Sequence, residues 1–417
     1  MTDRPDDRIE ADYLVETAED PARAAAAMAG EQSSGTFVAV PGEDSPGVRL
    51  ARARVERLEI IGESEAPAMP GATPGRPVLA RATLSWPLSN LGPSLPNLQA
   101  TVAGNLFELR AFSGLKLLDL RLPRAFADAN PGPAFGVAGT RALAGVAEGP
   151  LVGTIVKPSV GLSPEDTAAL VRTLAEAGID FVKDDELQAD GPHCPFEDRV
   201  RAVMRVVRDH GDRTGKTVMV AFNLTGEVDE MRRRHDLVAA EGGTCVMASM
   251  HSVGLAGVLA LRRHARLPLH AHRNGWGALG RHPRHGVSYV AWSKLWRLAG
   301  ADHLHVNGLA NKFCESDDSV IASAQAVLAP LWPDRPMIAM PVFSSGQTPR
   351  QAWPTWTALR SDDLIHAAGG GILAHPGGPR AGVESFREAW AAARAGLAPE
   401  AAAARAPALA AALGAFA

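Results

Sequence analysis

The sequence predicts an α/β protein with a C-terminal (β/α)8 barrel of the TIM type and a smaller N-terminal α+β domain. Three observations support this prediction. From Gly153 onward, short apolar strands alternate with amphipathic helices, giving about eight strand–helix units in roughly 240 residues, the size of such a barrel. The first part of the chain mixes a helix and strands without strict alternation. Residues 127–133 are rich in Asp, Asn, Pro and Gly and read as a linker. We therefore place the domains at residues 1–133 and 134–417.

The N-terminal domain should begin with a helix and continue as strands. A helix over residues 22–29 follows Asp20 and Pro21, a favourable helix start. Runs of apolar and β-branched residues predict strands. These predicted strands cover residues 36–40, 48–59, 78–86 and 98–103. Residues 62–77 are rich in Pro, Gly and Ala and should form an exposed loop.

The barrel domain is predicted from its repeating strands and helices. The expected strands are 154–156, 181–182, 218–222, 245–247, 268–271, 303–305, 337–340 and 364–366. The helices expected to follow them are 163–177, 196–210, 228–240, 255–263, 287–298, 319–327, 350–359 and 381–393. An open doubly wound sheet also alternates in this way, but it rarely has eight regular units. The Ala-rich tail, residues 399–417, should be helical.

Composition narrows the classes of function. The chain has 417 residues, of which 46% are hydrophobic and 21% charged, with a formal net charge of −4. It lacks a basic stripe, so a nucleic-acid partner is not expected. It also lacks an apolar run of about 20 residues or an apolar N-terminal signal, so neither a membrane span nor secretion is expected. Three widely spaced cysteines suggest a reducing compartment, by default the cytoplasm.

The segment 180–186 is the most informative stretch of the chain. It begins as a short apolar strand and ends in Lys183 followed by three acids. Side chains alternate along a strand, so Lys183 and Asp185 should face the same side, with Glu186 just beyond. Two carboxylates and an amine form an incomplete Mg²⁺ site. Carbamylation of the lysine by CO2 would complete it with an anionic oxygen donor. The alternative is a solvated run of charges at the end of a strand.

Polar or glycine-rich residues end most of the predicted barrel strands, where active sites of such barrels form. These are Lys157, Lys183, Asp185, Glu186, Asn223, His270, His272, Arg273, Asn274, His303, His305, Lys312, Ser344, Gly346, Gly369, Gly370 and Gly371. A single histidine in a strand is more often a core residue, and a triple glycine is more often a turn. The joint occurrence indicates an active site. The glycines after the last two strands suit a phosphate group, and Arg273 suits a second anion.

These segments resemble the large chain of ribulose-bisphosphate carboxylase (RuBisCO) in order and spacing. The matching segments are GTIVKP at 153–158, DFVKDDE at 180–186, HAHR at 270–273, DHLH at 302–305, GGG at 369–371, EQSSGT at 31–36 and GN at 104–105. The resemblance covers nearly the whole chain. It implies a ferredoxin-like N-terminal domain, a C-terminal barrel, and a homodimer in which one subunit's N-terminal domain completes the active site of the other.

The resemblance also implies roles for individual residues. Lys183 corresponds to the carbamylated lysine, and Asp185 and Glu186 correspond to the other Mg²⁺ ligands. Lys157 corresponds to the acid/base lysine, and His272 and Asn105 line the centre of the site. One phosphate site corresponds to Arg273, His305 and Ser344. The other phosphate site corresponds to Thr36, Lys312, Gly346, Gly369 and Gly370.

Departures from the carboxylase pattern set the expected reaction. Ser159 replaces a second lysine, Trp276 replaces a histidine and Phe37 replaces a tryptophan, and the loop 306–311 differs from the loop that closes over CO2. The chain is thereby identified as a RuBisCO-like protein (form IV) that retains the metal site but does not fix CO2. The metal would stabilise an enediolate, while Lys157 would move a proton at the adjacent carbon.

Several reactions within the family stay open. The favoured one is decarboxylation, or carboxyl transfer and hydrolysis, of 3-oxo-isoapionate 4-phosphate, whose two anionic ends Arg273 and Lys312 could hold. An enolase or isomerase acting on a methylthio-pentulose phosphate of methionine salvage is the alternative. Asn105 argues mildly against the methionine-salvage enolase, which is thought to place a lysine base near that position. A non-catalytic relative and a true ribulose-bisphosphate carboxylase are the remaining hypotheses.

Overall fold

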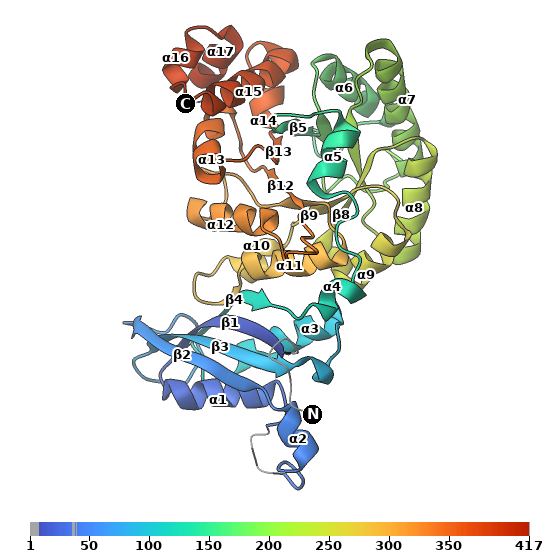
Figure 1. Cartoon of the computed structure of the whole chain (residues 1–417). Coiled ribbons are helices and arrows are strands. Elements are labelled where there is room, and N and C mark those ends of the chain that lie inside the picture. Colours follow the sequence, from blue (N-terminus) through green and yellow to red (C-terminus); the bar gives the residue numbers. More distant parts are fainter. Residues whose placement is uncertain (1–7, 36–37, 39, 417) are drawn as a thin grey trace. The chain divides into compact units, whose positions relative to one another are not determined.

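The computed structural model describes residues 8–35, 38 and 40–416 (Figure 1). The chain forms two compact units. The first comprises Met1–Pro131 and Gly275–Leu298, and the second comprises Gly132–Asn274 and Ala299–Ala417. The domain boundary expected after residue 133 stays a prediction. The predicted fold class, an α+β domain followed by an eight-stranded parallel barrel, is confirmed.

The first unit is built on a mixed sheet with the order β10-β4-β1-β3-β2. Its main elements are β1 (Arg8–Thr17), α1 (Pro21–Glu31), β2 (Arg54–Glu63), β3 (Val78–Pro87), α3 (Leu95–Val102) and β4 (Gly114–Arg121). The sequence of elements βαββαβ, with β1 antiparallel to both β3 and β4, is the ferredoxin-like arrangement. The short strand β10 (Gly286–Val287) extends this sheet in parallel with β4. The helices α10 (Trp276–Gly280) and α11 (Tyr289–Ala299) flank β10 in the chain.

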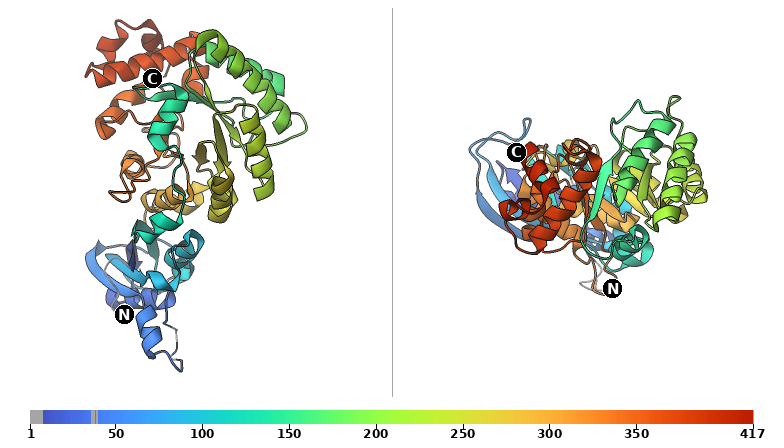
Figure 2. Two further views of the ribbon diagram at one scale, coloured as in Figure 1. Left: turned by 45° about the vertical axis from the view of Figure 1, so that its right-hand side comes forward. Right: turned by 90° about the horizontal axis from the view of Figure 1, so that it is seen from above.

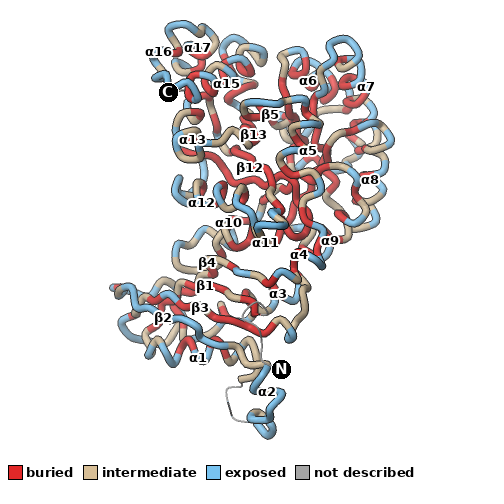
Figure 3. Tube along the Cα trace, viewed as in Figure 1, coloured by how far each residue is buried: buried red, intermediate tan, exposed pale blue. Residues whose placement is uncertain are grey.

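Burial divides the strands of this sheet into central and edge strands. Figure 3 shows β1 and β3 with many buried residues, whereas β2 at the edge is almost entirely exposed. The Tyr13 hydroxyl donates to the Val102 carbonyl oxygen at 2.7 Å, which ties β1 to the end of α3. The helix α1 begins as expected, because the Asp20 side chain accepts from the Arg23 N–H at 2.8 Å and Pro21 opens the first turn.

Three N-terminal predictions need correction or lie outside the described residues. The predicted strand 98–103 is instead part of α3, which has Ser94 as its N-cap and Pro96 in its first turn. The predicted strand 48–59 begins as the helix α2 (Pro46–Ala51), again with a proline at its start. Of the predicted strand 36–40, residues 36, 37 and 39 lie outside the described residues. The strands β1 and β4 were not predicted, because charged residues interrupt their apolar alternation.

The second unit is a closed barrel of eight parallel strands, as predicted (Figure 1). The strands in chain order are β5 (Leu151–Ile155), β6 (Phe181–Lys183), β7 (Met219–Asn223), β8 (Cys245–Ser249), β9 (Leu269–His272), β11 (His303–His305), β12 (Met340–Phe343) and β13 (Ile365–Ala367). Strand β12 begins three residues later than the strand predicted at 337–340. Met337 has a φ of 46°, a left-handed conformation that a strand does not accommodate.

Helices follow the barrel strands as predicted, except that the helix predicted at 287–298 is α11, which lies in the first unit. Figure 2 shows α15 to α17 packed together near the C-terminus. The helices of the second unit are α5 (Gly136–Ala144), α6 (Pro164–Glu176), α7 (Phe196–Thr214), α8 (Val228–Ala240), α9 (Met250–His264), α12 (Asp317–Leu328), α13 (Ala352–Leu359), α14 (Gly370–Leu373), α15 (Gly378–Arg394), α16 (Pro399–Ala403) and α17 (Pro407–Ala415). The remaining short helices are η2 (Leu88–Asn90), η3 (Asn105–Glu108), α4 (Ala125–Ala129) and η4 (Pro349–Gln351). Helix α9 is kinked at Gly254, whose φ is 73°.

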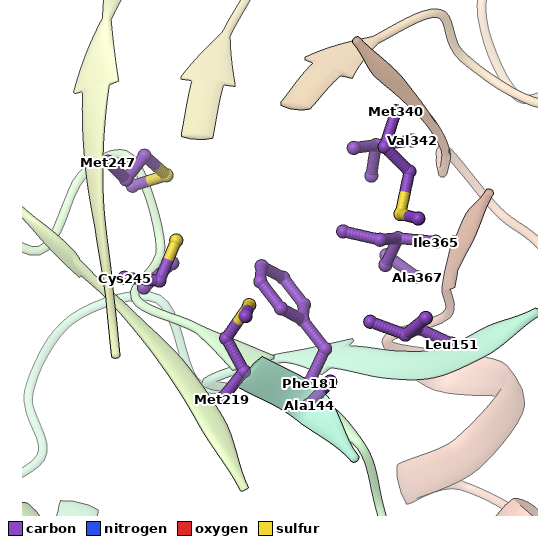
Figure 4. Close-up of a cluster of buried hydrophobic side chains, with 11 residues drawn as sticks. Ala144, Leu151, Phe181, Met219, Cys245, Met247, Met340, Val342, Ile365 and Ala367 are labelled. Atoms are coloured by element: carbon purple, nitrogen blue, oxygen red, sulfur yellow. The ribbon is translucent and has the colours of Figure 1, made fainter. Parts of the chain in front are cut away.

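An apolar cluster fills the barrel interior toward the amino-terminal ends of the strands. Figure 4 shows Phe181 projecting between side chains from opposite strands, including Met219, Met247, Met340 and Ile365. Each of these side chains is fully buried, and such burial contributes about 1.5–3 kcal/mol per large apolar side chain. The interior is therefore a packed core, which leaves the carboxyl ends of the strands as the place for chemistry.

Within the part of the chain that the structure describes, no helix combines the length and apolar character that a membrane span needs.

Candidate active site at the carboxyl ends of the barrel strands

Lys183 is the last residue of β6 and lies inside the wall of the barrel. In register it pairs with Ile155 of β5 and Ala221 of β7. Its side chain is 1% exposed, and the ammonium donates to the Asp184 carbonyl oxygen at 2.8 Å. Burial lowers the pKa of Lys183, although Glu186 and Asp185 oppose this effect. A lysine with a lowered pKa has more of its amine in the neutral, nucleophilic form.

Asp184 points away from Lys183 and into the protein. Its carboxylate accepts from Arg199 of α7 at 3.2 Å and from the Asn223 backbone N–H at 3.0 Å. Arg199 is fully buried and Asp184 is 2% exposed. This acid is therefore neutralised inside the barrel wall, which separates it from the other two acids of the segment. The alternation expected along the strand is what divides them.

Asp185 faces the open end of the barrel and pairs with Lys157, which follows β5. The Lys157 Nζ atom donates to Asp185 Oδ2 at 2.5 Å and to the Ser159 hydroxyl at 2.8 Å. Asp185 Oδ1 accepts from the Leu187 N–H at 3.0 Å. Burial tends to raise the pKa of Asp185, but the Lys157 and Leu187 hydrogen bonds outweigh it, so the pKa is lowered. Asp185 is therefore a carboxylate at neutral pH.

Glu186 lies between Lys183 and His272. Its Oε2 atom is 3.4 Å from Lys183 Nζ and 3.4 Å from His272 Nε2. Burial tends to raise the pKa of Glu186, but His272 and Lys183 together lower it. Burial, with Lys183, lowers the pKa of His272 to about 4, so its imidazole is neutral at pH 7. The ends of β6 and β9 thus bring two carboxylates, a buried amine and a neutral imidazole together.

Asn223, at the end of β7, holds the loop that carries these acids. Its side-chain amide donates to the carbonyl oxygens of Glu186, at 3.3 Å, and Gln188, at 3.2 Å. Its side-chain oxygen accepts from the Thr225 hydroxyl at 2.7 Å. The sequence placed Asn223 at a strand end but gave no sign that it supports the neighbouring loop.

His305, at the end of β11, takes part in a buried chain of side chains. Its Nδ1 atom lies 3.0 Å from the Ser344 hydroxyl, and its Nε2 atom lies 2.7 Å from His270 Nε2. His270 Nδ1 is 3.3 Å from His303 Nδ1, and His303 Nε2 is 2.8 Å from the Thr140 hydroxyl. Burial lowers the pKa of all three histidines, to about 3 for His303. These three histidines are therefore neutral at pH 7.

Arg273, which follows His272, forms an ion pair with Glu315 in a largely buried position. The Arg273 and Glu315 side chains are 8% and 14% exposed. Glu315 Oε2 also accepts from the Asn307 side-chain amide at 2.7 Å. Glu315 was not predicted, because an acid in the segment after β11 has no distinguishing pattern.

Lys312 and Gly346 lie in the loops after β11 and β12, and Gly369 and Gly370 lie where α14 begins after β13. The backbone N–H of Lys312 donates to the Ser345 carbonyl oxygen at 3.3 Å. A Cβ atom added at Gly346 would lie 3.5 Å from the Lys312 Cβ. Gly346 has a φ of 81°, a conformation that favours glycine. Gly370 would have no described heavy atom within 4 Å of an added Cβ, so the backbone there is open to a ligand.

Two predicted site residues belong to the first unit. Asn105 is exposed and begins η3. Thr36 lies outside the described residues. Their proposed contributions stay predictions.

A possible metal-binding group lies away from these strand ends. His235, Asp236 and His264 lie close enough to hold a metal ion. However, His235 Nε2 accepts from the Arg266 N–H at 3.0 Å, so the ring proton sits on Nδ1, which faces Asp236 at 3.1 Å. This arrangement is a satisfied hydrogen-bond network rather than a free ligand set.

A cavity of about 710 Å³ lies near the amino-terminal ends of β12 and β13, opposite the strand ends that carry the predicted site residues. Its lining includes Met337 and Asp363.

Comparison with known proteins decides the family. The family description "Ribulose bisphosphate carboxylase large chain, catalytic domain" matches residues 136–416, and its N-terminal domain matches residues 6–126. The chain belongs to the RuBisCO large-chain family. A 3-oxo-isoapionate-4-phosphate transcarboxylase/hydrolase of Xanthobacter autotrophicus is 61% identical over 409 residues, covering 98% of this chain and 99% of that protein.

Other members of the RuBisCO large-chain family also match this chain over nearly their full length. A 3-oxo-isoapionate-4-phosphate decarboxylase of Rhizobium etli is 41% identical over 413 residues, covering 98% of this chain and 97% of that protein. The crystal structure of a rubisco-like protein from Burkholderia fungorum matches with a TM-score of 0.93 and 50% identity, covering 98% of this chain and 99% of that one. The identification as a RuBisCO-like protein is thereby confirmed.

Proposed function

We propose that this chain is a Mg²⁺-dependent enzyme that acts on 3-oxo-isoapionate 4-phosphate by carboxyl transfer and hydrolysis. The observation that carries the proposal is the cluster of Lys157, Lys183, Asp185 and Glu186 at the ends of β5 and β6. The relative named for this activity is 61% identical over nearly the full length of both chains. Decarboxylation of the same compound is the second candidate, supported by the 41% identical relative.

The residues at the end of β6 fit a divalent metal. The buried Lys183 amine, with its lowered pKa, is suited to react with CO2, giving a carbamate and releasing a proton. A carbamate would join Asp185 and Glu186 as a third anion, against the single cation of Lys157. The cluster would then carry an excess of two negative charges, which a divalent cation neutralises. Asp184 does not enter this count because Arg199 neutralises it.

The metal and the chain's own residues would divide the work. Mg²⁺ held by carbamylated Lys183, Asp185 and Glu186 would supply a Lewis acid that polarises a substrate carbonyl oxygen. Lys157 is half exposed at the same edge and is held by Asp185 and Ser159. It would deliver the proton to the carbanion that is left on the substrate when its carbon–carbon bond breaks. His272, neutral and adjacent to Glu186, would donate or accept a hydrogen bond at the substrate oxygens.

The phosphate end of the substrate would lie over the last loops of the barrel. Lys312, Gly346, Gly369 and Gly370 provide a cation and backbone N–H groups without intervening side chains. Thr36 of the partner subunit would complete this site. Arg273, His305 and Ser344 would form the other end of the active site. Arg273 is already paired with Glu315, so this end would not hold a second anionic group as the sequence predicted.

We further propose a cytoplasmic homodimer in which Asn105 and Thr36 serve the partner's barrel. Exposed apolar residues on the edge strand β2, among them Ile60 and Ile61, offer surface for an interface. Cys194, Cys245 and Cys314 are free thiols, which supports a reducing compartment.

A panel of substrates tests the proposed reaction. Purified protein with Mg²⁺ and bicarbonate is incubated with 3-oxo-isoapionate 4-phosphate, with the diketo and methylthioribulose phosphates of methionine salvage, and with ribulose 1,5-bisphosphate. NMR follows proton exchange and product formation. Turnover of the first compound alone supports the proposal. Turnover of a methylthio compound alone would favour the enolase or isomerase, and turnover of none would favour a non-catalytic relative.

A further inference from the structure

The carboxylate of Glu315, in the segment between β11 and α12, occupies an anion-binding position. It forms an ion pair with Arg273, accepts from the Asn307 amide at 2.7 Å, and accepts from the Ser319 hydroxyl at 2.8 Å. An arginine, an amide and a hydroxyl are the donors that bind a phosphate or carboxylate ligand. Here the anion that they bind belongs to the chain itself.

The neighbouring hydroxyl groups are also directed at internal acceptors. The Thr140 hydroxyl donates to the Gly136 carbonyl oxygen, so its oxygen accepts from His303 Nε2–H. His303 Nδ1 then accepts from His270 Nδ1–H, because a neutral ring carries one proton.

The same reasoning extends to the open end of the barrel. His270 Nε2 accepts from His305 Nε2–H, and His305 Nδ1 therefore accepts from the Ser344 hydroxyl. The Ser345 hydroxyl donates to the Asn307 side-chain oxygen at 2.9 Å. Ser344 and Ser345 thus turn their protons inward, and an anion arriving beside them would meet oxygen lone pairs and the charge of Glu315.

We propose that Glu315 determines specificity by filling this second anion position, so that the active site selects substrates with one phosphate group over bisphosphates. The inference rests on the proposed function for the placement of the single phosphate near Lys312, Gly346 and Gly370. It assigns to the segment after β11 a role in rejecting a second phosphate, through like-charge repulsion in a largely buried position.

A pair of inert probes tests this specificity. Arabinitol 5-phosphate and arabinitol 1,5-bisphosphate differ by one phosphate group, and calorimetry gives the Kd of each in the presence of Mg²⁺. The wild-type protein should bind the bisphosphate no more tightly than the monophosphate. Glu315→Gln keeps the shape and an acceptor for Asn307 but removes the charge. It should favour the bisphosphate by about tenfold or more.

Control variants separate the local charge from other effects. Glu315→Asp retains the charge and should keep the wild-type ratio of the two Kd values. Asp318→Asn removes an exposed charge from the first turn of α12 and should also keep that ratio. Glu315→Ser removes the carboxylate with a smaller side chain and repeats the test if Glu315→Gln does not fold.

The outcomes distinguish this inference from the proposed function. An unchanged Kd ratio in the charge-removing variants would overturn the role of Glu315, as would bisphosphate binding that is absent from every variant. If the ratio changes as expected but no variant turns over 3-oxo-isoapionate 4-phosphate, the proposed function fails and the role of Glu315 stands.

Discussion

Lys157 and Asp185 meet at 2.5 Å, although they belong to different strand–loop units of the barrel. The Lys157 side chain is 45% exposed and the Asp185 side chain is 2% exposed, so the pair lies between solvent and the buried end of β6. The contact positions the proton-transferring group beside the proposed metal ligands. It also holds the Asp185 carboxylate ionised before any metal binds.

Removing the Lys157 amine should separate proton transfer from metal binding. We expect Lys157→Met to lower the rate of exchange of solvent deuterium into the product by roughly 10²–10⁴-fold, the usual contribution of a positioned acid/base group. Metal binding should persist because Lys183, Asp185 and Glu186 remain. NMR measures the exchange, and a metal titration serves as the control. Unchanged exchange would remove Lys157 from the mechanism.

Lys183 should be required for activation by CO2 and Mg²⁺. Lys183→Met should abolish the thermal stabilisation that bicarbonate and Mg²⁺ together give, and should lower kcat/KM by roughly 10³-fold or more, since a Lewis acid contributes several kcal/mol. Lys216→Met is a matched control, because Lys216 pairs with Asp180 just before β6 and away from the site. A Lys183→Met protein that still responds to both additions would contradict the metal assignment.

Activation should rise with pH. Burial lowers the pKa of Lys183 from its ordinary value of 10.5, so the neutral amine forms at lower pH than in free lysine. The midpoint of activation by bicarbonate should therefore lie below pH 10.5. Activation is measured as initial rate after incubation at each pH and dilution into one assay buffer. A midpoint at or above the ordinary value would show that the amine is not desolvated.

The buried pair of Arg199 and Asp184 should dominate local stability. Arg199→Met leaves a buried carboxylate without its partner, which costs about 3–5 kcal/mol in the free energy of unfolding. Asp184→Asn combined with Arg199→Met should restore part of that loss. Arg201→Met, on the same helix but in an exposed pair with Glu197, should change stability by less than about 1 kcal/mol. Urea unfolding measures all three, and equal effects at positions 199 and 201 would contradict the argument.

Stability should fall as the pH drops below neutral. Burial lowers the pKa of His303 and His366 from 6.5 to about 3, so both stay neutral in the folded protein. The unfolded chain binds these protons below pH 6.5, so each histidine removes about 1.4 kcal/mol per pH unit between pH 6.5 and about 3. Above pH 6.5 these histidines are neutral in both the folded and the unfolded state, so this loss of stability is absent. Urea unfolding from pH 7 to 5 measures the slope, which His366→Gln should reduce by about one proton.

The barrel was predictable because its signals are local and repeat. Each short apolar strand is followed by an amphipathic helix, as β7 and α8 illustrate. The N-terminal sheet was less predictable because its strands carry charges on the solvent face. Residues 98–103 are apolar enough for a strand, but the cap at Ser94 and the proline after it start a helix.

The sequence predicted which residues gather at this edge of the barrel, but it did not predict which side chains pair there. Strand alternation and the common edge of the barrel place Lys183, Asp185 and Lys157 together. The pairing of Arg273 with Glu315 joins segments more than 40 residues apart and depends on the path of the loop after β11. Local sequence patterns do not specify that path. The series of hydrogen-bonded side chains from Ser344 to Thr140 likewise forms only when the strands are closed into a barrel.

The central claim is that this site processes 3-oxo-isoapionate 4-phosphate by carboxyl transfer and hydrolysis, and an isotope label tests it most directly. The substrate is prepared with ¹³C in its carboxyl group and incubated with the protein, Mg²⁺ and unlabelled bicarbonate, and ¹³C NMR follows the label. We predict that the label stays in the carboxylate of an organic product. Release of the label as bicarbonate would contradict carboxyl transfer and support decarboxylation, and an unchanged substrate would contradict the proposed function altogether.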